Sequence, residues 1–230
     1  MTQHLEYSSG NTKITGGATM IINMGSATRC PSASLGLCEI AGKCYAVNAE
    51  HFRPQVLPYR DRQQEYWLGH DAESIALDIL AVQARKHQPF RYCRFNESGD
   101  FHTAECCHKL SDIARITHAT GDPLVYYTYT HRTDLLPHLA DRPRNLVIQV
   151  STSDPGAAKD YTAMGFNVFF CDTAISVKGR HVVSGMPAHD WATQELRKKY
   201  GASALLCGWD CGVCGYCKTN HHKPIYICLH

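Results

Sequence analysis

The clearest structural pattern in the chain lies in residues 124–171, which read LVYYTYTHRTDLLPHLADRPRNLVIQVSTSDPGAAKDYTAMGFNVFFC. Three apolar stretches in it, at residues 124–130, 145–150 and 166–171, have the length and the β-branched or aromatic content of strands. Residues 131–140 and 155–164 lie between them and have the composition of helices. Strands that alternate with helices predict a parallel sheet with covering helices.

The same alternation extends beyond this stretch in both directions. Residues 90–95 form a further expected strand, between a stretch rich in helix formers at 60–88 and a helix expected at 102–120. Asp71 is a candidate N-cap in the first of these stretches, and Ile75, Leu77 and Ile79 contribute to the apolar face of the helix that follows it. A last helix is expected at 190–200. We therefore predict an α/β fold, with a mostly parallel sheet curved into a partial (β/α) barrel.

Composition excludes several classes of protein. The chain has 230 residues, of which 44% are hydrophobic and 19% charged, a balance typical of globular rather than disordered proteins. A net charge of +2 creates no global field that would attract nucleic acid. The polar N-terminus, Met1 to Gly17, lacks the apolar core of a signal peptide, and no apolar run is long enough to span a membrane. We expect a cytoplasmic protein without a membrane partner, where grouped cysteines bind metal more often than they form disulfides.

Twelve cysteines are the unusual feature, and four of them form a late cysteine group, Cys207, Cys211, Cys214 and Cys217. Glycine follows the first three, which lets the backbone wrap closely around an ion or cluster. Four thiolates within eleven residues can supply every ligand of one tetrahedral metal or one four-iron cluster. The C-x3-C-x2-C-x2-C spacing favours iron-sulfur ligation, because zinc sites usually split their ligands into two separated pairs. Zinc is the alternative. The chain therefore divides into an α/β domain at residues 1–201 and a Cys-rich cluster-binding segment at 202–230.

An early cysteine group consists of Cys30, Cys38 and Cys44, spaced C-x7-C-x5-C. Three ligands would leave one iron of a four-iron cluster open to a small molecule, to water or to a distant residue. Candidates for that residue are Cys93, Cys171 and His230. The alternative is a structural loop with incidental cysteines. The five cysteines outside the two groups are expected to be buried packing residues: Cys93, Cys106, Cys107, Cys171 and Cys228.

Polar residues follow the expected strands. They are Glu97, Ser98, Gly99 and Asp100, then residues 128–131, then the stretch that contains Ser151 and Ser153, then Asp172 and Thr173. Ligands bind at the carboxyl ends of the strands in such sheets, so these residues outline a candidate cofactor pocket beside the early cysteine group. Ordinary turn and helix-cap chemistry is the alternative for each of them.

Several motifs together resemble the phage gene product 88 family. They are Cys44-Tyr45-Ala46, Ser98-Gly99-Asp100-Phe101, residues 127–130, the late cysteine group and the terminal YICLH. The resemblance runs from about Cys30 to His230. It implies a distant similarity to radical S-adenosylmethionine enzymes, in which three cysteines hold a four-iron cluster and S-adenosylmethionine binds the fourth iron. It also implies contacts from residues 98–100 to the methionine moiety and from Ser151 or Ser153 to the ribose.

The resemblance also bears on the late ligands. Residues 185–188, GMPA, stand where the family has a C-P-A segment, so Cys207 is expected to supply the fourth late ligand. For a phage-encoded protein, the expected compartment is the host cytoplasm.

Three functions compete on these grounds. The first is a redox iron-sulfur protein that holds two four-iron clusters, takes electrons from a donor and acts on an unknown substrate. In its radical S-adenosylmethionine-like form it would also bind S-adenosylmethionine. The second is a zinc-stabilised module that binds nucleic acid or another partner through basic residues around the late cysteine group, such as Arg197, Lys198, Lys199 and Lys218. The third is an electron carrier without a substrate.

Overall fold

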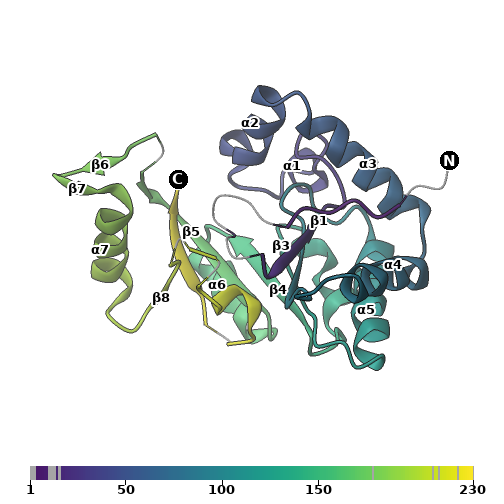
Figure 1. Ribbon diagram of the computed structural model, residues 1–230. Helices are drawn as coiled ribbons and strands as arrows, with labels where there is room; N and C mark the ends of the chain where they lie inside the picture. The colour runs from purple at the N-terminus through teal and green to yellow at the C-terminus, as the bar shows by residue number, and fades with distance from the viewer. Residues whose placement is uncertain are drawn as a thin grey trace.

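A computed structural model describes residues 4–9, 14, 17–177, 179–208, 210–211, 213–221 and 223–229. Its main sheet has seven strands in the order β1-β2-β3-β4-β5-β9-β8 (Figure 1). The strands are β1 (Thr19–Ile22), β2 (Tyr92–Phe95), β3 (Val125–Thr130), β4 (Leu146–Thr152), β5 (Asn167–Ser176), β8 (Leu205–Leu206) and β9 (Ile225–Leu229). Every neighbouring pair in this sheet is parallel. The predicted α/β fold with a parallel sheet is confirmed.

The α-helices are α1 (Pro31–Ser34), α2 (Tyr45–Phe52), α3 (Val56–Gly69), α4 (Ala72–Ala84), α5 (Ala104–Ala119), α6 (Pro155–Ala163) and α7 (Ala188–Tyr200). Three short 3₁₀ helices are η1 (Ala41–Lys43), η2 (Thr133–Leu139) and η3 (Tyr216–Lys218). A separate antiparallel pair, β6 (Val182–Val183) and β7 (Met186–Pro187), precedes α7. The chain from β1 to β5 thus adds each new strand beside the previous one, with helical segments between them.

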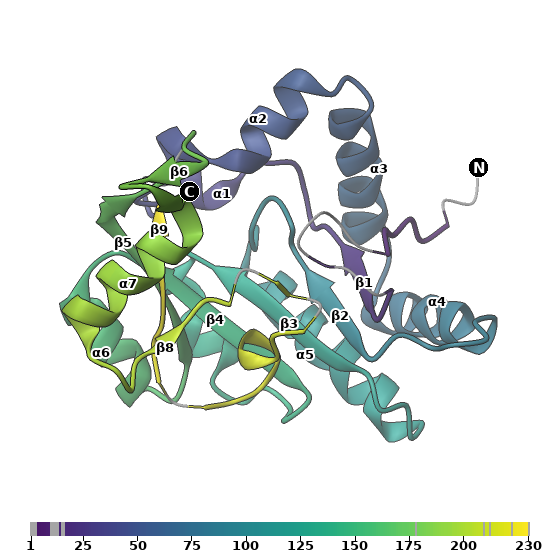
Figure 2. The same ribbon diagram turned by 60° about the vertical axis from the view of Figure 1, so that its left-hand side comes forward.

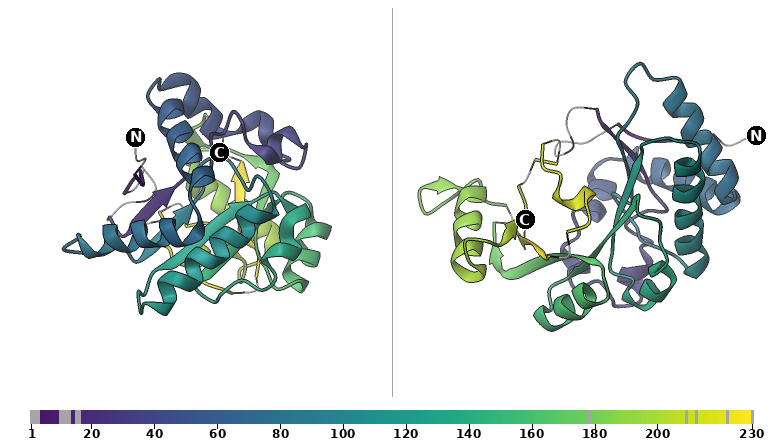
Figure 3. Two further views of the ribbon diagram at one scale, coloured as in Figure 1. Left: turned by 90° about the vertical axis from the view of Figure 1, so that its right-hand side faces the viewer. Right: turned by 90° about the horizontal axis from the view of Figure 1, so that it is seen from below.

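The outer face of the sheet carries the main apolar core. Alternate residues of the strands, such as Phe95, Tyr126 and Ile148, are fully buried there together with Trp67 and Ile113 of α3 and α5. Figure 3 shows these helices on the convex side of the sheet. Burial of this apolar surface is the main stabilising contribution.

The inner face is more polar and is covered by the C-terminal segment. Arg94 of β2 pairs in register with Tyr127 of β3, and Tyr129 pairs with Gln149 of β4. Parallel partners point to the same side of a sheet, so these side chains share one face. In Figures 2 and 3 the yellow segment between β8 and β9 crosses this side, and η3 contacts β3 and β4. The segment from residue 202 therefore both covers the sheet and adds two strands to it.

The structure confirms one detail of the sequence-based expectations and differs in two. The stretch at 60–88 contains α3, which ends at Gly69, and α4, which Asp71 begins as its N-cap, as predicted, accepting a 2.8 Å hydrogen bond from Ser74 N. Leu77, expected on the apolar face, is 57% exposed. The helix expected at 131–140 is the 3₁₀ helix η2, which contains Pro137, a residue that cannot donate a helical hydrogen bond.

The cysteines expected to be packing residues are mostly buried. Cys93, Cys107 and Cys228 are fully buried and Cys106 nearly so, which confirms the expectation for these four. Cys171 is only half-buried and lies on the inner face in the middle of β5. Among the residues that the structure describes, no helix combines the length and the apolar composition needed to cross a membrane.

Candidate metal centres

The early cysteine group gathers beyond the C-terminal end of β1. Cys30 directly precedes α1 and Cys44 directly precedes α2, and all three thiols are half-buried. Burial raises the pKa of the Cys38 thiol to about 11, and the charges of Cys30, Cys44 and Asp100 raise it further. Burial also raises the pKa of Cys30, as do Asp100 and Cys44. The three thiols therefore lie within electrostatic range of one another.

Three contacts attach this cysteine loop to the strand ends. The Ser32 hydroxyl donates to Asp100 Oδ2 at 2.5 Å. The Glu39 carboxylate accepts from the Thr152 hydroxyl at 3.0 Å and from the Ser153 backbone N–H. The Tyr45 hydroxyl donates to the Glu97 carbonyl at 2.9 Å. The loop is thus fixed over the carboxyl ends of β2 and β4.

Asp100 and its neighbours, predicted to bind a cofactor, form part of this attachment. Each Asp100 carboxylate oxygen accepts two hydrogen bonds. Oδ1 accepts from Phe101 N and the Thr130 hydroxyl, and Oδ2 accepts from the Ser32 hydroxyl and His131 N. Asp100 is 3% exposed. Its carboxylate therefore joins the early loop to the segments that follow β2 and β3.

Ser98 and Gly99 pack against the backbone of Gly25. The Ser98 hydroxyl donates to the Gly25 carbonyl at 3.0 Å. Gly99 has a φ of +73°, and a Cβ on it would lie 2.7 Å from that same carbonyl. Glycine is required here for both its backbone conformation and its size.

The other three candidate cofactor residues are more accessible. The Glu97 carboxylate lies 3.9 Å from Arg60 Nη2. Ser151 is half-buried on the inner face in β4, in register with Phe169. Ser153 is half-buried after the end of β4 and contacts Glu39 through its backbone.

A buried ion pair contacts the backbone just before the early cysteine loop. Arg60 Nη1 donates to Glu50 Oε1 at 2.7 Å, and both side chains are almost fully buried. Glu50 also accepts from Ala27 N at 2.6 Å and from Thr28 N at 2.9 Å, just before Cys30. Burial alone would raise the pKa of the Glu50 carboxyl, but these hydrogen bonds outweigh burial and hold the pKa below its usual value.

We expect Glu50→Gln to destabilise the protein by about 3–5 kcal/mol at pH 7, because it leaves the Arg60 charge buried without its partner. A group with a lowered folded-state pKa stabilises the fold above its unfolded pKa, about 4.3 for Glu, and this contribution disappears as the pH falls through the folded-state pKa. The difference between wild type and variant should therefore shrink below about pH 4. Urea unfolding at several pH values measures it. Glu6→Gln, in an exposed pair with Arg62, should change stability by less than about 1 kcal/mol; an equal loss in both variants would contradict the account.

The late cysteine group gathers on the inner face of the sheet. Burial raises the pKa of Cys217 to about 12, a hydrogen bond from Tyr129 opposes this, and the charges of the other three late cysteines add to it. The charges of Cys211 and Cys217 also act on Tyr127. A Cβ on Gly208 would lie 3.6 Å from Cys214 Sγ, so the backbone approaches this thiol closely. Gly212 and Trp209 lie outside the described residues.

Hydrogen bonds fix this segment to the sheet. Gln149 Nε2 donates to the Cys217 carbonyl at 3.1 Å, and Asn167 Nδ2 donates to the Thr219 carbonyl at 2.7 Å. Lys218 is 6% exposed, and its Nζ donates to the Cys211 carbonyl at 2.6 Å and lies 4.4 Å from the centre of the Tyr92 ring. A buried positive charge thus lies beside the late thiols.

The spacing of the thiols bears on the kind of metal centre they could form. Within the described part of the chain, no three His, Cys, Asp or Glu side chains are close enough to bind one metal ion. An iron-sulfur cluster separates its thiolate ligands more widely, because iron and sulfide atoms lie between them. Within the described residues, neither cysteine group therefore has the geometry of a single-ion site.

The candidates for an additional early ligand have different surroundings. Cys93 lies in the apolar core of the outer face, away from the inner face. Cys171 lies within electrostatic range of Glu39 and Lys43, both in the early loop. His230 lies outside the described residues. Cys171 is thus closer to the early loop than its apolar sequence context indicated.

Cys106 has an environment that its sequence context does not reveal. Burial raises the pKa of its thiol, but hydrogen bonds from His102, Trp67 and Thr103 outweigh this and lower the pKa to about 6. Trp67 Nε1 donates to Cys106 Sγ at 3.4 Å. These donors come from α3 and from the N-terminus of α5, so only tertiary structure brings them to the sulfur.

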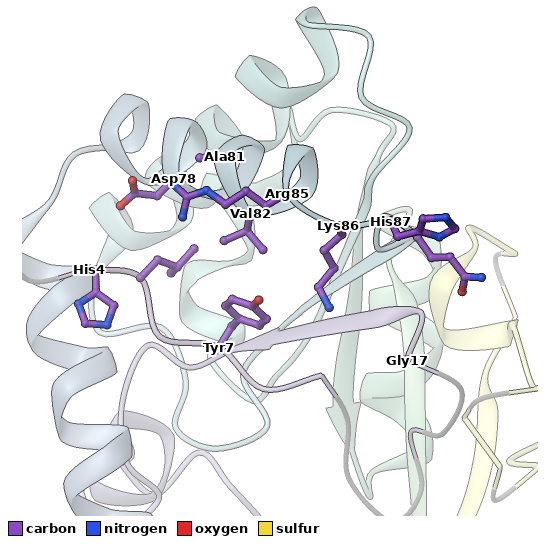
Figure 4. A pocket seen from close by; sticks show the side chains of 11 residues that line it. His4, Tyr7, Gly17, Asp78, Ala81, Val82, Arg85, Lys86 and His87 are labelled. Carbon is purple, nitrogen blue, oxygen red and sulfur yellow. The ribbon is translucent and has the colours of Figure 1, made fainter.

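A surface pocket of about 920 Å³ lies near the N-terminal ends of β1 and β2, away from the strand ends that hold the early loop. Gly17, before β1, and residues 86–88, before β2, are among its lining residues. The side chains of Tyr7, Val82 and Lys86 face it (Figure 4). None of the candidate cofactor or metal-binding residues lines it.

Comparison with known proteins gives one match. Residues 4–220 match the family described as gene product 88. No curated protein and no solved structure matches the chain. The matched range includes both cysteine groups and the strand ends that hold the early loop, and the chain is thus a phage-type protein that belongs to the gene product 88 family.

Proposed function

We propose that the protein binds two four-iron clusters, one in each cysteine group, and that the open position of the early one serves substrate chemistry. The observation that carries the proposal is the gathering of the three early thiols over the C-terminal edge of a parallel sheet, where α/β proteins bind ligands. Four further thiols gather on the inner face of the same sheet. When bound, the clusters would supply one-electron chemistry.

The chain's own residues would have distinct tasks. Cys30, Cys38 and Cys44 would hold the early cluster, and the contacts of Ser32 and Glu39 would keep their loop in place over the strand ends. Cys207, Cys211, Cys214 and Cys217 would hold the late cluster. The Tyr129 hydroxyl would donate to the Cys217 sulfur.

Metal analysis of anaerobically purified protein tests this proposal. We expect about eight iron and eight sulfide per chain for two four-iron clusters. Zinc as the sole metal, without sulfide, would overturn it. Three of the four basic residues that would support a zinc-dependent nucleic-acid module have other surroundings: Lys199 pairs with Asp172, Lys198 with Glu195, and Lys218 is buried.

The proposal extends to S-adenosylmethionine as the ligand at the open early position. Dithionite would supply one electron for cleavage of the sulfonium carbon–sulfur bond, giving methionine and, after transfer of one hydrogen atom from substrate or solvent, 5'-deoxyadenosine. Chromatographic detection of both products tests the extension. If reduced protein with full iron content forms neither, the extension fails and the two-cluster proposal stands, with electron transfer as its remaining role.

We expect Lys218→Met to lower the reduction potential of the late cluster and to leave that of the early cluster unchanged. Reduction adds negative charge, which the nearby buried ammonium stabilises, so its removal favours the oxidised state. Spectroelectrochemical titration of anaerobic protein measures both potentials. Lys159→Met, at an exposed lysine of α6, is the control. Equal potentials in wild type and Lys218→Met would contradict the placement of the late cluster beside Lys218.

A further inference from the structure

The Arg94 guanidinium on the inner face has unused hydrogen-bonding capacity. Among the described residues its only hydrogen bond runs from Nε to the Asn96 carbonyl at a long 3.4 Å, and no carboxylate lies within ion-pair distance. Its Cζ lies 5.0 Å from the centre of the Tyr129 ring. Arg94 is half-buried rather than fully buried. Its two Nη groups therefore retain donors for a partner that the protein itself does not supply.

Tyr127 contributes a second unused donor beside Arg94. The two residues are register partners in β2 and β3 and point to the same face. Tyr127 is 2% exposed, and among the described residues its hydroxyl makes no hydrogen bond, although the oxygen itself is not sealed from solvent. A hydroxyl that still has a donor to offer can bind a ligand group that reaches the inner face.

Arg94 lies between the two cysteine groups. Its charge acts on Tyr45, which adjoins Cys44 in sequence and is also affected by the Cys44 charge. On the other side its charge acts on Tyr129, whose hydroxyl donates to the Cys217 sulfur. The Glu97 carboxylate is within electrostatic range of Arg94 but forms its ion pair with Arg60. A positive charge with free donors thus lies near both candidate metal centres.

We propose that Arg94 and Tyr127 form a binding site for an anionic group, a carboxylate or a phosphate, of a ligand that lies on the inner face between the two cysteine groups. The planar guanidinium presents paired N–H donors that match the two oxygens of such a group. The role of this ligand as a substrate rests on the proposed function, whereas the binding of the anion does not.

Calorimetric titration of the anaerobically purified full chain with inorganic phosphate and, separately, with succinate tests the site and distinguishes the two ligand chemistries. We expect at least one of these anions to bind to the wild type and Arg94→Gln to weaken that binding about tenfold or more. Arg91→Gln is the matched control, because Arg91 is exposed and directly precedes β2. It should bind like the wild type.

Tyr127→Phe provides a second variant that removes only the hydroxyl and keeps the packing of the ring. We expect it to weaken anion binding several-fold with an unchanged melting temperature. The site is overturned if the wild type binds neither anion, or if Arg94→Gln and Tyr127→Phe both bind as the wild type does. Iron and sulfide measured on the same samples separate this outcome from failure of the proposed function, since loss of anion binding at unchanged iron content concerns the Arg94 site alone.

Discussion

Replacing Cys217 with serine is expected to remove about half of the iron and sulfide, leaving about four of about eight irons per chain. The Cys217 sulfur lies among the other three late thiols, and a serine hydroxyl is a poor substitute for a thiolate as an iron ligand. The early cysteine group has its own loop and its own contacts to the strand ends, so its iron should remain. Iron and sulfide analysis of anaerobic protein measures the loss.

A matched pair of variants completes this test. Cys38→Ser should likewise remove about half of the iron, from the early group. Cys93→Ala changes a fully buried cysteine of the outer core and should keep the full iron content, although it loses some packing. If Cys217→Ser retains all of its iron, or if Cys93→Ala loses as much, the assignment of ligands is wrong.

Asp100→Ala is expected to destabilise the protein by about 3–5 kcal/mol and to release the early loop. The substitution removes the acceptor of four hydrogen bonds at a site that is 3% exposed, and it leaves the donors of Ser32, Phe101, Thr130 and His131 without this partner. A loss of this size is a large part of the stability of a typical domain. Guanidinium unfolding followed by circular dichroism measures it, and iron analysis should show partial loss from the early group.

Asp154→Ala is the control for this variant. Asp154 follows β4 as Asp100 follows β2, but it is exposed and only caps α6, through hydrogen bonds from Gly156 N and Ala157 N. Its replacement should cost about 1 kcal/mol and leave the iron content unchanged. If Asp100→Ala is as stable as Asp154→Ala, Asp100 does not hold the early loop, and its role as a cofactor-binding residue becomes the better interpretation.

The strands and most helices were predictable because their apolar residues repeat at short, local spacings. The order of the strands in the sheet was less predictable. Residues 225–229 form an apolar run near the C-terminus, yet β9 lies between β5 and β8 in the sheet. That position depends on how the whole C-terminal segment crosses the inner face, which no local pattern encodes. The same crossing brings Lys218 to Tyr92, a contact between residues far apart in sequence.

The candidate site was also predictable only in part, because local spacing predicts some of its residues and tertiary contacts determine the rest. Sequence spacing identified the two cysteine groups, and in the structure the members of each group lie within electrostatic range of one another. The strand-end rule identified Asp100, but its bonds to Ser32 and Thr130 depend on three segments meeting in space. Arg94 was missed, because alternation in residues 90–95 predicts a strand and does not tell which face the late cysteine group will cover.

Anomalous diffraction at the iron absorption edge, from crystals of anaerobically purified protein, tests the central claim most directly. The account predicts two separate iron sites, one bounded by Cys30, Cys38 and Cys44 and the other by the four cysteines of the late group. The early site should show one iron without a cysteine ligand. Signal at the zinc edge in place of iron at either group, or an early loop without any metal, would contradict the account.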